Sequence, residues 1–266
     1  MFEKLAIAFA GLLAGMLVNY LADTLPVKRR LAQPICNHCG QKQGLQNYLI
    51  WPRRCVNCGK RRPPRVWFVE LGFAALFLWV WLTPDALKFI PFWMAALLLI
   101  FFGVVAVIDM ELRLILHPVS MAGVALGLLM GITTHGLWLT LAGGLGGFLI
   151  MYILFGLGVL FTRLTRKLQG NDEEVALGFG DVNLAGVLGL ILGWPQILMG
   201  LLLSVLAAGV ISLVLVLLMI VLRRYRAFLA IPYGPFLILG AFILLFLPHW
   251  GQVILARAGP LFWIGN

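Results

Sequence analysis

The sequence predicts an all-α, polytopic membrane protein of about eight transmembrane helices, with a small cytoplasmic zinc-binding loop module between helices one and two. Three observations predict this class. Hydrophobic residues make up 62% of the 266 residues and charged residues 11%, against about 45–50% and about 25% in soluble domains. Apolar runs close to the ~20 residues of a bilayer-crossing helix recur along the chain. All four cysteines lie in the first long polar stretch.

Eight apolar runs carry the prediction of the spans. Their approximate residues are 3–25, 67–83, 90–108, 118–134, 137–162, 182–194, 196–222 and 232–248. The first run lacks a small-residue cleavage site, so we expect a retained span and not a cleaved signal peptide. The sixth is short and rich in glycine, and we expect it to begin inside the protein. Glycines 143, 144, 146 and 147 in the fifth run predict close packing of two helices.

The distribution of basic residues predicts the orientation. Ten of the twenty Lys and Arg residues lie between residues 27 and 65. If that stretch is cytoplasmic, the N-terminus is outside and seventeen of the twenty fall in cytoplasmic loops, as the positive-inside rule requires. A patch for nucleic acid or anionic lipid is the alternative interpretation. The orientation signal is the simpler explanation and is favoured.

The predicted organisation has three parts. Residues 1–26 form a first transmembrane helix, residues 27–66 a cytoplasmic four-cysteine module, and residues 67–266 a multi-span core. A module of some forty residues is too small to build its own core. We therefore expect a bound metal to hold it together.

The cysteines form two Cys-x2-Cys pairs separated by fifteen residues, namely Cys36 with Cys39 and Cys55 with Cys58. Four thiolates form a closed tetrahedral site, which suits structural zinc and leaves no open position for catalysis. A glycine follows each pair, at Gly40 and Gly59, where the turn needs a positive φ. His38 lies between ligands, and we expect it to be exposed. A structural role is favoured over a nucleic-acid-binding ribbon, so no nucleic acid partner is expected.

Two aspartates stand apart from the other acids because each adjoins an apolar run on the predicted cytoplasmic side. Asp109 closes FFGVVAVID at the C-terminal end of a helix, where the helix dipole disfavours negative charge. Asp181 ends the sequence GFGD and is either the N-cap of the next helix or half of an acid–base pair. Two carboxylates facing each other in a low-dielectric cleft share a proton. Such a pair can hydrolyse a peptide bond by general acid–base catalysis.

Other catalytic chemistries lack their residues. The sequence has three serines and four histidines, with no histidine in the middle of a span, no His-Glu-x-x-His motif and no Walker-type loop. Two alternatives from other classes remain open. One is a multi-span ion-coupled transporter or channel that uses Asp109 and Asp181 as intramembrane acids. The other is a membrane-anchored zinc ribbon that binds nucleic acid.

Several motifs together resemble the type IV prepilin peptidases, a family of GxGD aspartyl proteases. They are GFGD before an apolar helix, the second aspartate at the end of an earlier span, and the paired cysteines after the first span. IPYGPFLILGA at residues 231–241 is similar to the family's last-span motif, and RVWFVELGF at residues 65–73 looks like its entry to span two. The resemblance covers nearly the whole chain.

The resemblance implies a membrane aspartyl endopeptidase with Asp109 and Asp181 as the catalytic pair. Gly178 and Gly180 would let the backbone approach the substrate closely. The substrates would be prepilins or pseudopilins, in which a short basic leader precedes an apolar helix in the lipid bilayer. Cleavage would fall just after a glycine, at the cytoplasmic face of the bacterial inner membrane.

The resemblance leaves a second activity open. Many members of the family also methylate the new N-terminus, with S-adenosylmethionine as the methyl donor. In this chain Asn183 stands where the family usually has lysine, and Thr24 where its first-span signature has arginine. Whether methylation is retained is therefore an open alternative.

Three acids just upstream of GFGD have two interpretations. Asp172, Glu173 and Glu174 are ordinary solvated loop charges, or they attract a leader rich in Lys and Arg. The first interpretation is slightly favoured.

Overall fold

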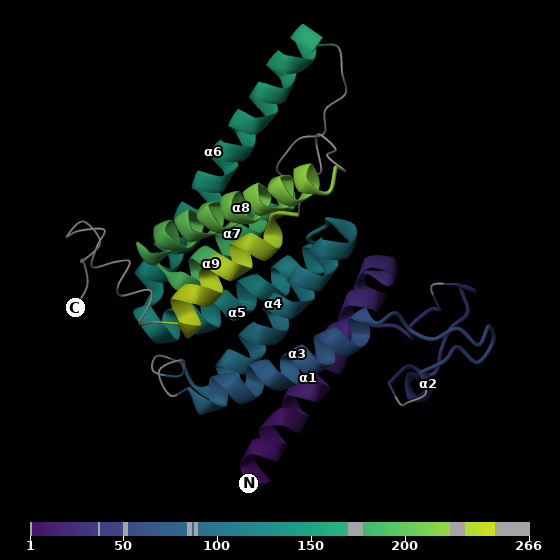
Figure 1. Ribbon diagram of the computed structural model, residues 1–266. Coiled ribbons are helices and arrows are strands. Elements are labelled where there is room, and N and C mark those ends of the chain that lie inside the picture. Colours follow the sequence, from purple (N-terminus) through teal and green to yellow (C-terminus); the bar gives the residue numbers. More distant parts are fainter. Residues whose placement is uncertain are drawn as a thin grey trace. The chain divides into compact units, whose positions relative to one another are not determined.

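The computed structural model describes residues 2–36, 38–49, 53–83, 87, 90–169, 178–223 and 232–247, with the backbone alone for 165–169. These residues form helices and isolated β-bridges, which confirms the all-α class (Figure 1). The helices are α1 (Phe2–Lys28), α2 (Leu45–Leu49), α3 (Arg65–Leu82), α4 (Phe92–Leu112), α5 (His117–His135), α6 (Leu137–Gln169), α7 (Phe179–Leu192), α8 (Gln196–Val221) and α9 (Gly234–Phe246).

Six of the described helices are long and apolar enough to cross a membrane, namely α1, α3, α4, α5, α6 and α8. The two shorter apolar helices are α7 and α9. Helix α8 has no charged residue and few polar ones, yet its apolar residues Val205 and Leu213 are exposed. A helix that shows apolar side chains on its outer face belongs against lipid and not against water. The chain is therefore a multi-pass membrane protein.

Prolines account for helix boundaries near the C-terminal end of the described chain. Helix α9 has Pro235 in its first turn, where the missing N–H costs nothing. The predicted span over residues 232–248 is longer than this helix, which covers Gly234–Phe246. The helix ends at Phe246 because Leu247 precedes Pro248 in the sequence, and a residue before proline is disfavoured in helical conformation.

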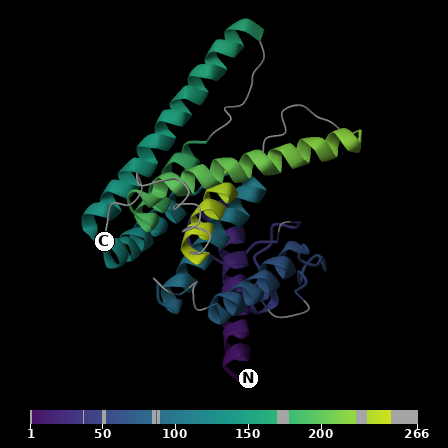
Figure 2. The same ribbon diagram turned by 60° about the vertical axis from the view of Figure 1, so that its left-hand side comes forward.

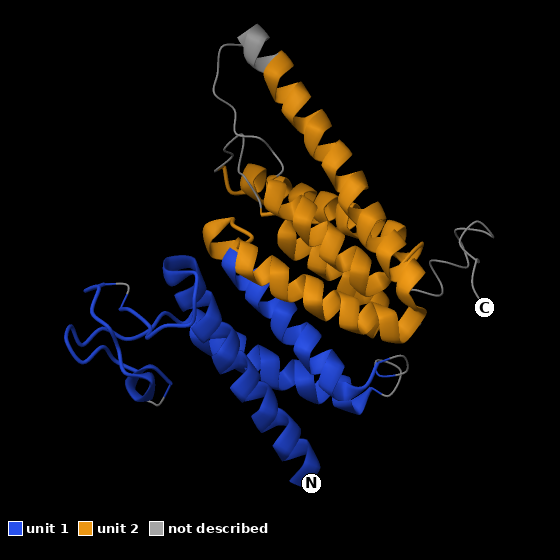
Figure 3. Ribbon diagram, turned by 180° about the vertical axis from the view of Figure 1, so that it is seen from behind, with its two compact units in different colours: residues 1–108 blue, residues 109–266 orange. Residues whose placement is uncertain are grey.

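The chain divides into two compact units, Met1–Ile108 and Asp109–Asn266, which Figure 3 colours blue and orange. In the first unit α1 packs on α3. Close approach of these helices depends on Gly15, since a Cβ at this position would lie 2.6 Å from the Cα of Glu70. The first part of α4 also packs on α3, where the rings of Phe77 and Phe92 meet edge to face with centroids 5.8 Å apart.

Helix α7 forms the core of the second unit. It contacts α5, α6, α8 and α9, and ten of its fourteen residues are buried. This placement agrees with the prediction that the short sixth apolar run begins inside the protein. Figures 1 and 2 both show the later part of α6 extending beyond the helices that surround α7.

Glycines let α6 and α7 pack at very short range, as the sequence predicted. A Cβ on Gly147 of α6 would lie 2.5 Å from the carbonyl oxygen of Ala185 on α7. A Cβ on Gly189 of α7 would collide with the backbone carbonyl of Gly143 on α6. Because backbone atoms occupy this space, a larger residue forces the helices apart.

We predict that Gly189→Ala lowers the free energy of unfolding by about 1–3 kcal/mol, the usual cost of overpacking. Thermal unfolding of the full-length protein in detergent measures the effect. Gly156→Ala on α6 is the matched control, because a Cβ there meets nothing within 4 Å, and we expect a change within about 0.5 kcal/mol. Equal melting temperatures for both variants would contradict the packing argument.

Candidate functional site

The two Cys-x2-Cys segments fold into matching turns. The Gly40 N–H donates to the Cys36 carbonyl and the Gly59 N–H to the Cys55 carbonyl, each at 2.9 Å. Both glycines have positive φ, at 69° and 68°, as the sequence predicted. Isolated antiparallel bridges close each turn, pairing residue 35 with 42 and residue 54 with 61.

The turns bring the four cysteine sulfurs together, all within 4.8 Å of one another. The Cys36 and Cys58 sulfurs are 3.7 Å apart, and the Cys39 and Cys55 sulfurs 3.5 Å. A tetrahedron with metal–sulfur bonds of about 2.3 Å has edges of about 3.8 Å. The four cysteines can therefore hold one metal ion. His38 is exposed and is not a member of the cluster.

The turns also favour ionised sulfur. The backbone N–H groups of Cys39 and His38 lower the pKa of the Cys36 thiol. The N–H of Cys58, followed by the Gln43 side chain, lowers the pKa of Cys55 to about 6. The Lys60 N–H lowers the pKa of Cys58, but burial and the neighbouring sulfurs outweigh it and raise the value to about 11. A cation at the centre of the cluster would lower the pKa of Cys58 and so allow all four cysteines to be thiolates.

An ionic network attaches the cysteine module to α1 and α3. Asp23 of α1 accepts hydrogen bonds from Arg62 and Arg65, both at 2.6 Å, and from the Tyr48 hydroxyl. Burial, and then the Asp23 charge, raises the pKa of Tyr48, so this phenol stays a hydrogen-bond donor. The guanidinium of Arg62 also lies over the Tyr48 ring, 3.8 Å from its centroid.

A second ion pair lies deeper in the first unit. One nitrogen of Arg53 donates to both carboxylate oxygens of Glu70, at 2.9 and 2.8 Å, and both side chains are buried. Neither Glu70 nor Asp23 was predicted to have a role. An acid inside the apolar run RVWFVELGF is costly to bury alone, so the position of Glu70 could have predicted a basic partner.

Asp109 and Asp181 lie together in the second unit. Asp109 is in the last turn of α4 and Asp181 in the first turn of α7, with 4% and 8% of their surfaces exposed. The charge of Asp109 acts on Asp181, so the two carboxylates are within electrostatic range. Among the described residues, neither acid forms a salt bridge.

Asp109 is held by the start of α9. Its Oδ2 accepts a hydrogen bond from the Gly234 N–H at 3.0 Å. A Cβ on Gly234 would lie 2.6 Å from the same oxygen, so only glycine leaves room for the carboxylate. The Asp181 charge acts on the hydroxyl of Tyr233, so this group is within electrostatic range of the pair. In the sequence this Pro-Tyr-Gly-Pro segment carries only a family resemblance, and no local pattern predicts a role for Tyr233 or Gly234.

Asp181 is not the N-cap of α7, which corrects one of the two interpretations left open. Gly178 is the N-cap, and Asp181 is the third residue of the helix. Its Oδ2 accepts a hydrogen bond from the Gly178 N–H at 3.1 Å, as the acid of a capping box does. Gly180 packs against the α4–α5 connection, where a Cβ would lie 2.9 Å from the Cβ of Ile115.

An apolar groove of about 260 Å³ lies between α5, α6 and α7. Its lining includes the polar residues Asn183, His117 and Ser120. Asn183 follows Asp181 by two residues, which is about 200° around a helix. The groove therefore opens on a different side of α7 from the acid pair. The upstream acids Asp172, Glu173 and Glu174 lie outside the described residues.

Comparison with known proteins identifies similar sequences over most of the chain. Residues 95–215 match the family model described as the type IV leader peptidase family. A prepilin leader peptidase/N-methyltransferase of Aeromonas hydrophila is 30% identical, over 87% of this chain and 76% of its own length. The protein of the same name from Pseudomonas aeruginosa is 31% identical, over 84% of this chain and 73% of its own length. No solved structure matches significantly.

We predict that the full-length protein binds one metal ion per chain through its four cysteines. Elemental analysis of the purified protein measures the stoichiometry. Cys55→Ser removes one of four thiolates, so we expect metal content to fall well below one ion per chain. His38→Ala is the matched control in the same module and should keep its metal. Loss of metal in the histidine variant, or full retention in the cysteine variant, would contradict the assignment.

Proposed function

Because this chain belongs to the type IV leader peptidase family, we propose that it is a membrane aspartyl endopeptidase that removes the short basic leader of prepilins or pseudopilins. The observation that carries the proposal is the pair Asp109 and Asp181. Both acids are buried, come from different helices and are within electrostatic range of each other. Each accepts a backbone N–H bond and neither is ion-paired with a described residue, so both remain available for proton transfer.

The proposed reaction uses the two acids in opposite roles. One carboxylate takes a proton from a water molecule, whose oxygen bonds to the scissile carbonyl carbon. The other acid, protonated at the start of the cycle, gives its proton to the amide nitrogen as the C–N bond breaks. The products are the carboxylate of the leader and the amine of the shortened substrate.

The surroundings of the pair support substrate binding at the start of α7. Gly178 is exposed and carries no side chain that would keep an extended peptide away from the backbone. The space beside Gly180 is filled by Ile115, so Gly178 is the better candidate for close approach of the substrate. The Tyr233 hydroxyl is within electrostatic range of Asp181 and is a candidate donor to the substrate. We also propose that the basic leader is attracted by the negative charges of Asp172, Glu173 and Glu174.

We propose that the ion held by the four cysteines is structural zinc. Four thiolates form the usual closed zinc site, which offers no position for substrate. The ion would fix the two turns, and with them the arginines that bind Asp23. Its proposed role is folding of the module and not chemistry.

We propose that the protein lies in the bacterial inner membrane with the cysteine module and the acid pair at the cytoplasmic face. The ten basic residues between positions 27 and 65 support this orientation. A cytoplasmic site would meet the basic leader of a substrate whose apolar helix lies in the same bilayer.

Methylation of the new N-terminus is the second candidate activity, and the names of the relatives favour it. The methyl donor would be S-adenosylmethionine, and no described residue is assigned to it. The transporter interpretation of Asp109 and Asp181 finds no support in the comparisons, since the matches concern leader peptidases.

We predict that Asp109→Asn and Asp181→Asn each slow cleavage of a prepilin-like substrate by at least about 100-fold, because each removes one member of the acid–base pair. Mass spectrometry of the products in detergent measures cleavage, and with S-adenosylmethionine present it also detects methylation. Glu111→Gln neutralises an exposed acid in the same turn as Asp109 and should cleave normally. Wild-type rates in either asparagine variant would exclude the pair as the catalyst.

We predict that Gly234→Ala slows cleavage by about 10- to 100-fold, because the added methyl group displaces the Asp109 carboxylate. The same assay measures the rate, and a melting curve verifies that the variant is folded. Gly209→Ala on α8 is the control, since a Cβ there meets nothing within 4 Å. A folded Gly234→Ala protein with wild-type activity would show that the position of Asp109 does not limit the reaction.

A further inference from the structure

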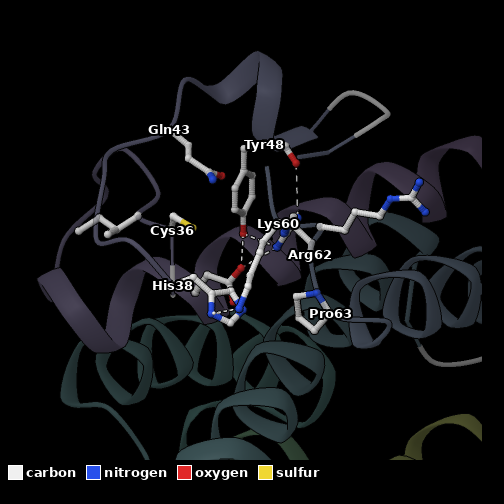
Figure 4. Close-up of a pocket in the computed structure, with 10 residues that line it drawn as sticks. Cys36, His38, Gln43, Tyr48, Lys60, Arg62 and Pro63 are labelled. Atoms are coloured by element: carbon white, nitrogen blue, oxygen red, sulfur yellow. Dashed lines mark hydrogen bonds and ion pairs between the residues drawn. The ribbon is translucent and has the colours of Figure 1, made fainter. Parts of the chain in front are cut away.

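A cavity of about 260 Å³ lies between the cysteine module and α1, and neither Asp109 nor Asp181 lines it (Figure 4). Its lining includes Lys60, Arg61 and Arg62, together with Asp23 and Tyr48. Figure 4 shows the Lys60 side chain meeting His38, whose Nδ1 lies 3.3 Å from Nζ. Nothing in the proposed peptidase reaction uses this cavity.

The charge around the cavity is strongly positive. Between Asp23 and Glu70 the sequence has ten basic residues and no acid. These two acids are already engaged, Asp23 by Arg62 and Arg65 and Glu70 by Arg53. Of the cavity's cations, Lys60 and Arg61 have no acidic partner among the described residues. Guanidinium and ammonium groups in this state bind the oxygens of a phosphate group well.

The second cysteine turn positions Lys60 and Arg61. The Lys60 carbonyl accepts a hydrogen bond from the Cys55 N–H at 3.0 Å, and residue 61 forms the bridge with residue 54 that closes the second turn. Arg62 follows directly and reaches back to Asp23 on α1. The cavity therefore keeps its shape only while the cysteine turns are folded.

The cavity also lies at the ends of two helices of membrane-spanning length. Asp23 is near the end of α1, and Pro63 in its lining is two residues before the start of α3. Helices α1 and α3 pack together, and a helix that crosses a bilayer ends near the headgroups, so we expect the cavity at that level. A phospholipid is therefore the nearest source of a phosphate group.

We propose that this cavity binds the phosphate of an anionic phospholipid headgroup, with Lys60 and Arg61 as the residues that contact it. Arg62 is already held by Asp23 and Tyr48 and shapes the wall of the site. The metal ion organises the site by fixing the second cysteine turn. The inference does not depend on the peptidase activity.

Native mass spectrometry of the full-length, delipidated protein tests the proposal by counting bound lipid during titration. We expect phosphatidylglycerol to bind more tightly than phosphatidylcholine. Each Lys or Arg near an anionic surface contributes roughly a fivefold gain in affinity. The variant Lys60→Gln/Arg61→Gln should therefore bind phosphatidylglycerol roughly 30-fold more weakly.

The matched control is Lys42→Gln/Arg54→Gln, which removes two exposed charges from the same module but outside the cavity lining. We expect it to bind like the wild type. Equal weakening in both double variants would show diffuse surface charge and overturn the site. If the cavity double variant loses its metal, Arg61→Gln alone replaces it, with an expected loss of roughly fivefold.

Two further arms complete the test. Inorganic phosphate at millimolar concentration should not displace phosphatidylglycerol. Full displacement would show that the cavity binds a free anion and not a lipid headgroup, and would overturn the proposal. Removal of the metal by a chelator should abolish the lipid preference, and an unchanged preference would overturn the role of the metal turn. Binding is measured without cleavage, so a failure of this proposal is distinguishable from a failure of the proposed peptidase function.

Discussion

The cost of burying a carboxylate in an apolar protein governs the arrangement of both units. An unpaired buried charge is expensive, and this chain meets the cost in two different ways. In the first unit Asp23 and Glu70 are neutralised by arginines. In the second unit Asp109 and Asp181 are supported by single backbone N–H groups. The first solution ties the cysteine module to α1 and α3, and the second leaves two acids without a salt bridge among the described residues.

The sequence predicted much of the fold, because apolar runs determine where helices form in a membrane protein. The positions of the described apolar helices follow the predicted runs closely. The two cysteine turns were equally predictable, because the cysteine spacing and the glycine after each pair determine their geometry. Asp109 and Asp181 were recognisable because each interrupts the edge of an apolar run.

Other features depend on contacts between distant segments, which local patterns do not reveal. The support of Asp109 by Gly234 joins residues 125 positions apart. Arg53 pairs with Glu70 and so offsets the free-energy cost of burying this acid in the apolar helix α3. The sequence of α3 alone does not reveal this partner. The assignment of Gly178 as N-cap, with Asp181 reaching back to it, excludes Asp181 as the N-cap residue, which the letters GFGD alone could not do.

The length of α7 has a consequence for how this helix is held in a bilayer. Fourteen residues of helix extend about 21 Å, whereas the hydrocarbon layer is about 30 Å thick. Helix α7 is therefore too short to have both of its ends at the level of the headgroups. The helices α5, α6 and α8, which pack against it, are long enough to cross a bilayer. The neighbours of α7, and not its own length, hold it in the membrane.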